Sequence, residues 1–152
     1  MGNELYGDDG VGIHVIRKIR QDVKRRKVLA VNMKNVTLEE CSLSGLALLD
    51  VIIGYDRLIL VDTIKRRDPI PGRIHLLEEK EIRAIPGPSP HYVSIPQTIE
   101  IARKLGLHVP SEIKIIAIEA KNIYCLGEGL SEEMKVKLPA IIKKVEDVLA
   151  HN

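Results

Sequence analysis

Residues 57–63 are Arg57-Leu58-Ile59-Leu60-Val61-Asp62-Thr63, a run that stays apolar until it meets an acid. Unbroken apolarity over this length is typical of a strand that is buried on both faces, as in a parallel sheet. Residues 112–119 show the same pattern and predict a second buried strand. Two such strands with helical segments between them favour an α/β sheet that helices cover on both sides.

The rest of the chain alternates between helical and extended patterns. It contains no internal repeat, linker or low-complexity tract, and we expect one domain over residues 1–152. Three prolines exclude regular structure over residues 83–92, and Pro139 should kink the last helix or mark where its regular part begins. The expected helices are residues 11–26, 42–53, 94–106 and one that Ser131 caps, and the expected shorter strands are residues 36–40 and 73–77.

Composition excludes several classes of protein, because the 152 residues are 45% hydrophobic with no Phe or Trp and only four Tyr. Such a chain can fill one core, but it lacks the aromatic platforms on which single-stranded nucleic acid stacks. The net charge of +2 gives no field that would attract DNA or anionic lipid. There is no membrane-spanning apolar run and no signal peptide, and two lone cysteines fit a reducing cytosol. We therefore expect a cytoplasmic protein without nucleic-acid or membrane partners.

Acidic residues and a histidine gather where the strands are expected to end. Asp8 and Asp9 lie in a glycine-rich first loop, Asp62 ends a buried strand, and His91 lies in the proline-rich loop. The active crevice of an open α/β sheet lies outside the carboxyl ends of its strands. Two carboxylates and an imidazole form a ligand set that suits Ni, Zn, Fe or Mn. These residues therefore form a candidate metal site.

Each candidate also has a purely structural interpretation. Asp8 or Asp9 could cap the helix that starts near Gly10, and His91 could be a surface residue. A carboxylate that ends an apolar strand is costly unless it is paired or coordinated, which favours a functional Asp62. Glu119 ends the second buried strand. It could orient the residues of the site without touching a ligand, or it could be a capping group.

Four motifs resemble those of the hydrogenase maturation proteases, the endopeptidases that trim the C-terminal tail of [NiFe]-hydrogenase large subunits. The resemblance covers nearly the whole chain, and the combination is specific although each motif alone is modest. The motifs are Gly2-Asn3-x-Leu5-x-Gly7-Asp8-Asp9-Gly10-x-Gly12, Leu58-Ile59-Leu60-Val61-Asp62, Ser89-Pro90-His91 and Gly129-Leu130-Ser131.

The resemblance implies a three-layer α/β/α fold with a mostly parallel, twisted sheet of about five strands. It implies that Asp9, Asp62 and His91 are the catalytic and metal-binding residues. In these proteases the three groups recognise nickel that is already held by the immature large subunit, so the metal arrives with the substrate. The implied activity is an aspartate- and nickel-dependent peptide hydrolase without an organic cofactor. Its implied partner is the large-subunit precursor, and its implied state is a monomer or a weak homo-oligomer.

Two features depart from the family pattern. The first strand of the family, which should be central and lead into Gly2-Asn3, is absent from this chain. We expect either a misplaced initiation codon or a shortened chain. The segment Glu40-Cys41-Ser42-Leu43-Ser44-Gly45 matches only loosely the family segment that follows its second strand.

Two other functions compete with the protease. A receiver-type phosphoacceptor domain would place Asp8, Asp9, Asp62 and Lys121 around Mg²⁺. Against it, Lys121 is followed by Asn122 instead of proline, and the receiver chemistry gives no role to a histidine. The third possibility is a non-enzymatic chaperone that binds the metallated subunit without cutting it.

Overall fold

The computed structural model describes residues 1–25, 35–78, 81, 95–121, 123–127 and 129–150. Three strands form the sheet of this described part: β1 (Arg57–Ile64), β2 (Ile74–Glu78) and β3 (Glu112–Glu119), in the order β1-β3-β2. β1 and β3 are parallel, and β2 runs antiparallel to β3. The two strands expected from the apolar runs are therefore present and adjacent.

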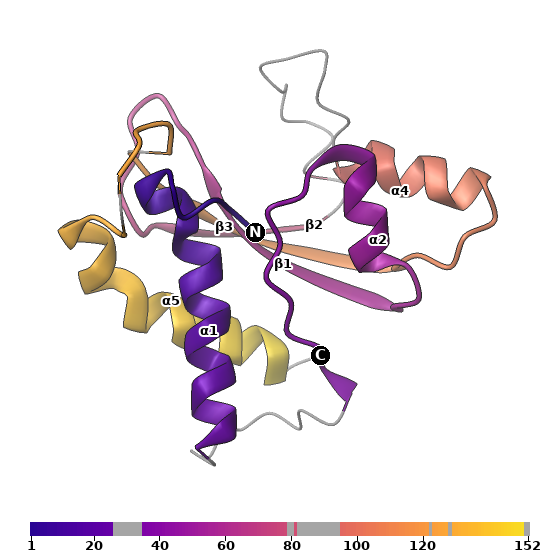
Figure 1. The fold of residues 1–152 in the computed structure, drawn as a ribbon, viewed down its shortest axis with the longest axis horizontal. Coiled ribbons are helices and arrows are strands. Elements are labelled where there is room, and N and C mark those ends of the chain that lie inside the picture. Colours follow the sequence, from indigo (N-terminus) through magenta and orange to yellow (C-terminus); the bar gives the residue numbers. More distant parts are fainter. Residues whose placement is uncertain (26–34, 79–80, 82–94, 122, 128, 151–152) are drawn as a thin grey trace.

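Helices cover both faces of the sheet (Figure 1). One face packs against α1 (Val11–Lys24) and α5 (Glu132–Ala150), and the other against α2 (Leu49–Ile52) and α4 (Ile95–Lys104). Side chains alternate along β1, so Val61 joins the first hydrophobic cluster and Leu60 the second. The predicted α/β class is confirmed. The described residues form three strands where about five were expected, and that detail is not confirmed.

The strand expected over residues 36–40 is wrong, since this segment has no regular structure. The amide of Gly2 donates to the carbonyl of Cys41 at 3.2 Å, and the amino group of Met1 donates to the carbonyl of Val61 in β1. Met1 and Gly2 therefore lie between β1 and Cys41, the residue that follows the segment. A strand needs backbone partners along its length, and two residues supply too few.

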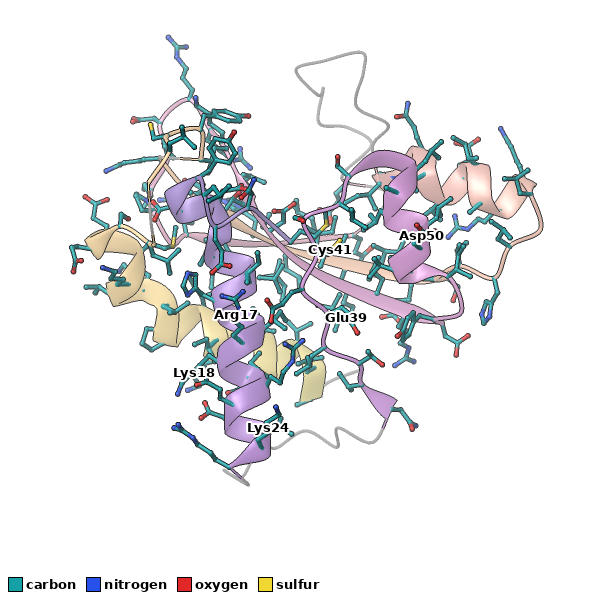
Figure 2. All side chains as sticks on the ribbon, viewed as in Figure 1. Arg17, Lys18, Lys24, Glu39, Cys41 and Asp50 are labelled. Carbon is teal, nitrogen blue, oxygen red and sulfur yellow. The ribbon has the colours of Figure 1, made fainter. Side chains whose placement is uncertain are left out.

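Ion pairs rather than a backbone ladder hold this segment. Arg17 projects from α1 toward it, and its Nε donates to Glu40 Oε2 at 2.9 Å (Figure 2). The Arg17 Nη1 and Nη2 atoms bind Glu4 at 2.6 and 2.9 Å. Arg20 adds contacts to Glu40 at 2.7 Å and to the carbonyl of Leu38 at 2.6 Å. The first loop, α1 and residues 38–40 are thus tied together.

The helix expected over residues 42–53 is shorter than predicted. A 3₁₀ turn spans Gly45–Leu48 and α2 follows it. α5 runs from Glu132 through Pro139 without interruption, so the proline does not mark its start. No described helix combines the length and the apolarity that a membrane crossing requires.

Candidate active site

Asp62 and Thr63 lie at the carboxyl end of β1 and point to opposite faces of the sheet. Asp62 pairs across the sheet with Ala117 and so lies on the side of α2 and α4. The Thr63 hydroxyl donates to Asp9 Oδ1 at 2.7 Å. This bond joins the end of β1 to the first loop and brings Asp9 to the same sheet edge as Asp62.

Asp9 belongs to the 3₁₀ turn Gly7–Gly10, which leads directly into α1. Its second oxygen, Oδ2, accepts the backbone amide of Asn3 at 2.8 Å. Each Asp9 oxygen therefore has one internal donor and keeps further lone pairs for a ligand. The two donors come from different segments, so they fix the orientation of the carboxylate.

The environment of Asp62 disfavours its charged form. Burial raises the pKa of this carboxyl above its usual 3.8, and the nearby Asp9 carboxylate raises it further. Two groups lower the pKa and so oppose these effects: the amino group of Met1 and the backbone amide of Thr63. The Thr63 amide donates to Asp62 Oδ1 at 2.9 Å. The two carboxylates repel each other electrostatically at the end of the strand. A bound cation or proton would relieve this repulsion.

Asp8 has a structural role that differs from the position of Asp9 at the site. It is buried, and its two oxygens accept the amide and the hydroxyl of Ser131 at 2.7 and 3.0 Å. The Ser131 hydroxyl in turn accepts the amide of Met134 at 3.2 Å and caps α5 as predicted. The alternative in which Asp8 or Asp9 caps the helix near Gly10 is wrong, because α1 has no side-chain cap. Asp8 instead joins the first loop to the start of α5.

His91, the third predicted site residue, lies outside the described residues, as does the loop 83–92 that carries it. Within the described part of the chain, no group of three His, Cys, Asp or Glu side chains could hold a metal ion. The structure therefore brings together two members of the predicted set, Asp9 and Asp62. Two carboxylates alone are an incomplete set of hard oxygen ligands, so a metal bound here needs further ligands from elsewhere.

The receiver arrangement is not supported. Lys121 Nζ binds Glu133 at 3.1 Å, and Asp8 is occupied by Ser131. Both residues are therefore engaged away from the Mg²⁺ site that a receiver would need.

The contact between Glu119 and His75 at this edge was not predicted from the sequence. Glu119 is 2% exposed, and its Oε1 lies 2.7 Å from His75 Nε2. Its Oε2 accepts the amide of Ile70 at 2.6 Å, so the possible capping role of Glu119 is borne out by the geometry. The pairing with His75 depends on the antiparallel register of β2 against β3, which places His75 beside Ala117. No periodicity in the sequence reveals that register.

We predict that Glu119→Gln flattens the pH dependence of stability. The Ile70 amide, and then His75, hold the pKa of the Glu119 carboxyl below its usual 4.5. A depressed acid pKa stabilises the fold above the unfolded-state value, and this contribution is lost as pH falls through the folded-state value. Urea unfolding from neutral pH to about pH 3 should show a steeper loss in the wild type than in the variant. Parallel curves would contradict this role.

A second prediction concerns the hydroxyl that orients Asp9. Thr63→Val keeps the shape of the side chain but removes the donor to Asp9 Oδ1. Losing such a supporting bond typically costs about 10- to 100-fold in activity or metal affinity. Thr63→Ser retains the donor and should stay close to wild type. The rates at which the three proteins cleave a hydrogenase precursor, the substrate that the resemblance implies, check this prediction. Equal rates for Thr63→Val and the wild type would contradict it.

The architecture defines the class of protein first: a three-layer α/β protein with paired carboxylates at the carboxyl end of a parallel strand pair. A family model described as hydrogenase maturation protease matches residues 13–148. The chain therefore belongs to the hydrogenase maturation protease family, and this membership makes it a peptidase.

Individual relatives agree with this assignment. The chain is 24% identical over 152 residues to the hydrogenase expression/formation protein HupD of Rhizobium leguminosarum bv. viciae, with 98% of this chain and 71% of that protein covered. Its fold is similar to the hydrogenase maturating endopeptidase HybD from Escherichia coli, with a TM-score of 0.78, 20% identity, and coverage of 99% and 88%. It is also similar to the [NiFe] hydrogenase maturation protease HybD from Thermococcus kodakarensis, with a TM-score of 0.65, 23% identity, and coverage of 97% and 94%.

Proposed function

We propose that this protein is a cytoplasmic endopeptidase that removes the C-terminal tail of a [NiFe]-hydrogenase large-subunit precursor after nickel has been inserted. Family membership supports the peptidase and its precursor substrate. The observation that carries the site assignment is the convergence of Asp9 and Asp62 on one sheet edge, where the Asp9 charge acts on Asp62. Nickel is substrate-borne in this proposal, and no organic cofactor is required.

Asp9, Asp62 and His91 bind the nickel that the precursor's own cysteines already hold. Two carboxylates and an imidazole complete the coordination of a borderline metal without a resident ion. A precursor without nickel offers nothing for these groups to bind, so tail removal waits for metal insertion. Bound nickel therefore reports that metal insertion is complete before the tail is cut.

Asp62 is the best placed residue to activate the attacking water. It lies two residues before the end of β1, and the Thr63 amide fixes one of its oxygens. A carboxylate that accepts one fixed backbone amide keeps lone pairs with which it can act as a general base. The Asp62 oxygen that does not bind nickel takes a proton from water as the water attacks the scissile carbonyl. That proton then passes to the amine that leaves as the C–N bond breaks, while the nickel ion holds the peptide in place. Among the described residues Cys41 is buried and Cys125 is exposed, and neither is hydrogen-bonded to a histidine that could activate it, so direct attack by water is favoured.

Cleavage of a nickel-loaded large-subunit precursor tests the proposal. Intact-mass spectrometry should show a single cut that releases a C-terminal peptide. Binding of the precursor with no change in mass would favour the chaperone instead. The same assay with acetyl phosphate and Mg²⁺ should give no acid-labile phosphate on Asp62.

A further inference from the structure

Four large apolar side chains are exposed beside the acidic edge: Leu5, Tyr6, Tyr124 and Leu126. Their exposed fractions are 64%, 36%, 67% and 79%. Single exposed apolar residues are ordinary, but a group gathered from two loops marks a surface that is covered when a partner binds. We call these four residues the loop patch.

The loop patch is preformed by backbone hydrogen bonds. The Gly127 amide donates to the carbonyl of Leu5 at 3.0 Å, and the Gly7 amide donates to the carbonyl of Gly127 at 3.1 Å. Tyr6 and Gly127 form a parallel β-bridge, so the two loops run side by side. A surface whose backbone is already fixed loses little conformational entropy when it binds.

The loop patch is continuous with the candidate site. The amide of Asp9 donates to the carbonyl of Tyr6 at 3.1 Å, so one turn of chain separates the patch from a site carboxylate. The loops that follow β1 and β3 lie on the same side of the molecule as the first turn (Figure 1). A chain segment held in the site would reach the patch without bending away from the surface.

Positive charge borders the loop patch. The loop after β1 carries Lys65, Arg66 and Arg67, all exposed. Lys65 Nζ lies 4.8 Å from the centroid of the Tyr124 ring, and Arg66 Nε lies 3.8 Å from Glu119. Among the described residues, Lys65 and Arg67 have no acidic partner. These cations favour a ligand that carries acidic groups next to apolar ones.

We propose that the loop patch is the docking surface for an extended peptide segment of the precursor, apolar with neighbouring acidic residues, adjacent to the bond that is cut. This inference rests on the proposed function for the identity of the partner. Apolar side chains of the segment pack on Leu126 and Tyr124, and a neighbouring carboxylate of the segment meets Lys65. Docking contributes to affinity independently of nickel, which engages the carboxylates of the site.

Steady-state cleavage of the nickel-loaded precursor tests the docking surface. Leu126→Asp should raise KM about tenfold or more while kcat changes little, because the contact binds substrate and transition state equally. Leu105→Asp is the matched control, since Leu105 is 69% exposed and lies just beyond α4. Lys65→Glu should raise KM in low salt and lose most of its effect in high salt, because Lys65 lies against the Tyr124 ring. Equal KM values for the two aspartate variants would overturn the proposal.

A binding measurement separates this inference from the proposed function. Metal-free precursor, captured on a biosensor, should bind wild type and Leu105→Asp alike, and Leu126→Asp about tenfold more weakly. This readout does not require cleavage, so a wild-type protein that fails to cut refutes the function and leaves docking measurable. Sedimentation of the protein alone should show the same mass for wild type and Leu126→Asp. A wild-type dimer that Leu126→Asp dissociates would assign the patch to a second copy and overturn the proposal.

Discussion

Asp62→Asn is expected to lower the rate of tail cleavage by at least about 100-fold, which is the lower range for losing a general base. Asparagine has the same shape and can still accept the Thr63 amide, so the local geometry is preserved. It cannot take a proton from water, and it is a poor ligand for a divalent metal. The cleavage rate of nickel-loaded precursor, measured by intact mass, gives the effect.

The fold of this variant should remain intact, and its stability provides the control. Burial raises the pKa of Asp62, which means that folding disfavours the charged form. At neutral pH, removing that charge therefore costs no stability, and the thermal midpoint should equal or exceed that of the wild type. Asp50→Asn makes the same change of charge at an exposed acid on α2 and should leave cleavage unaltered. Normal cleavage by Asp62→Asn would remove Asp62 from the chemistry.

Gly12→Ala is expected to cause the largest loss of stability. A Cβ atom at this position would lie 2.5 Å from the carbonyl oxygen of Val61 and 2.4 Å from that of Met1. Both contacts are with backbone, so α1 must move away from β1. Overpacking of this kind costs up to about 3 kcal/mol, which outweighs the roughly 1 kcal/mol that alanine gains over glycine within a helix. Urea unfolding should show a clearly lower midpoint.

Displacement of α1 should also impair catalysis, because the turn that carries Asp9 leads directly into this helix. Gly127→Ala is the matched control, since an added Cβ there meets no atom within 4 Å. It should unfold at the wild-type midpoint. If Gly12→Ala is as stable as Gly127→Ala, the close packing of α1 on β1 is not a requirement of the fold.

The sequence predicted the parts of the fold that depend on local pattern. Unbroken apolar runs identified β1 and β3, because a strand buried on both faces needs apolar side chains at every position. Helical spacing of apolar residues identified α1 and α5, and Pro96 and Gly106 marked the two ends of α4. The sequence pattern of residues 36–40 could not decide whether they form a strand, since a strand also needs a neighbouring strand. At this side of β1 the neighbour is the short segment Met1–Gly2.

The candidate site was predictable where it follows from topology. Asp62 lies near the carboxyl end of a parallel strand, and this edge is where open α/β sheets bind ligands. The separate tasks of Asp8 and Asp9 were not predictable, because the Ser131 amide that binds Asp8 lies 123 residues further along the chain. The Glu119–His75 pair likewise depends on register, and the loop patch on the pairing of two distant loops.

Cleavage of the precursor with and without nickel tests the central claim most directly. The wild-type protein, mixed with nickel-loaded precursor and with the same precursor prepared metal-free, should shorten only the loaded form. Adding nickel to the metal-free precursor before the protease should restore the cut. Equal cleavage of the loaded and metal-free forms would contradict nickel recognition through Asp9, Asp62 and His91.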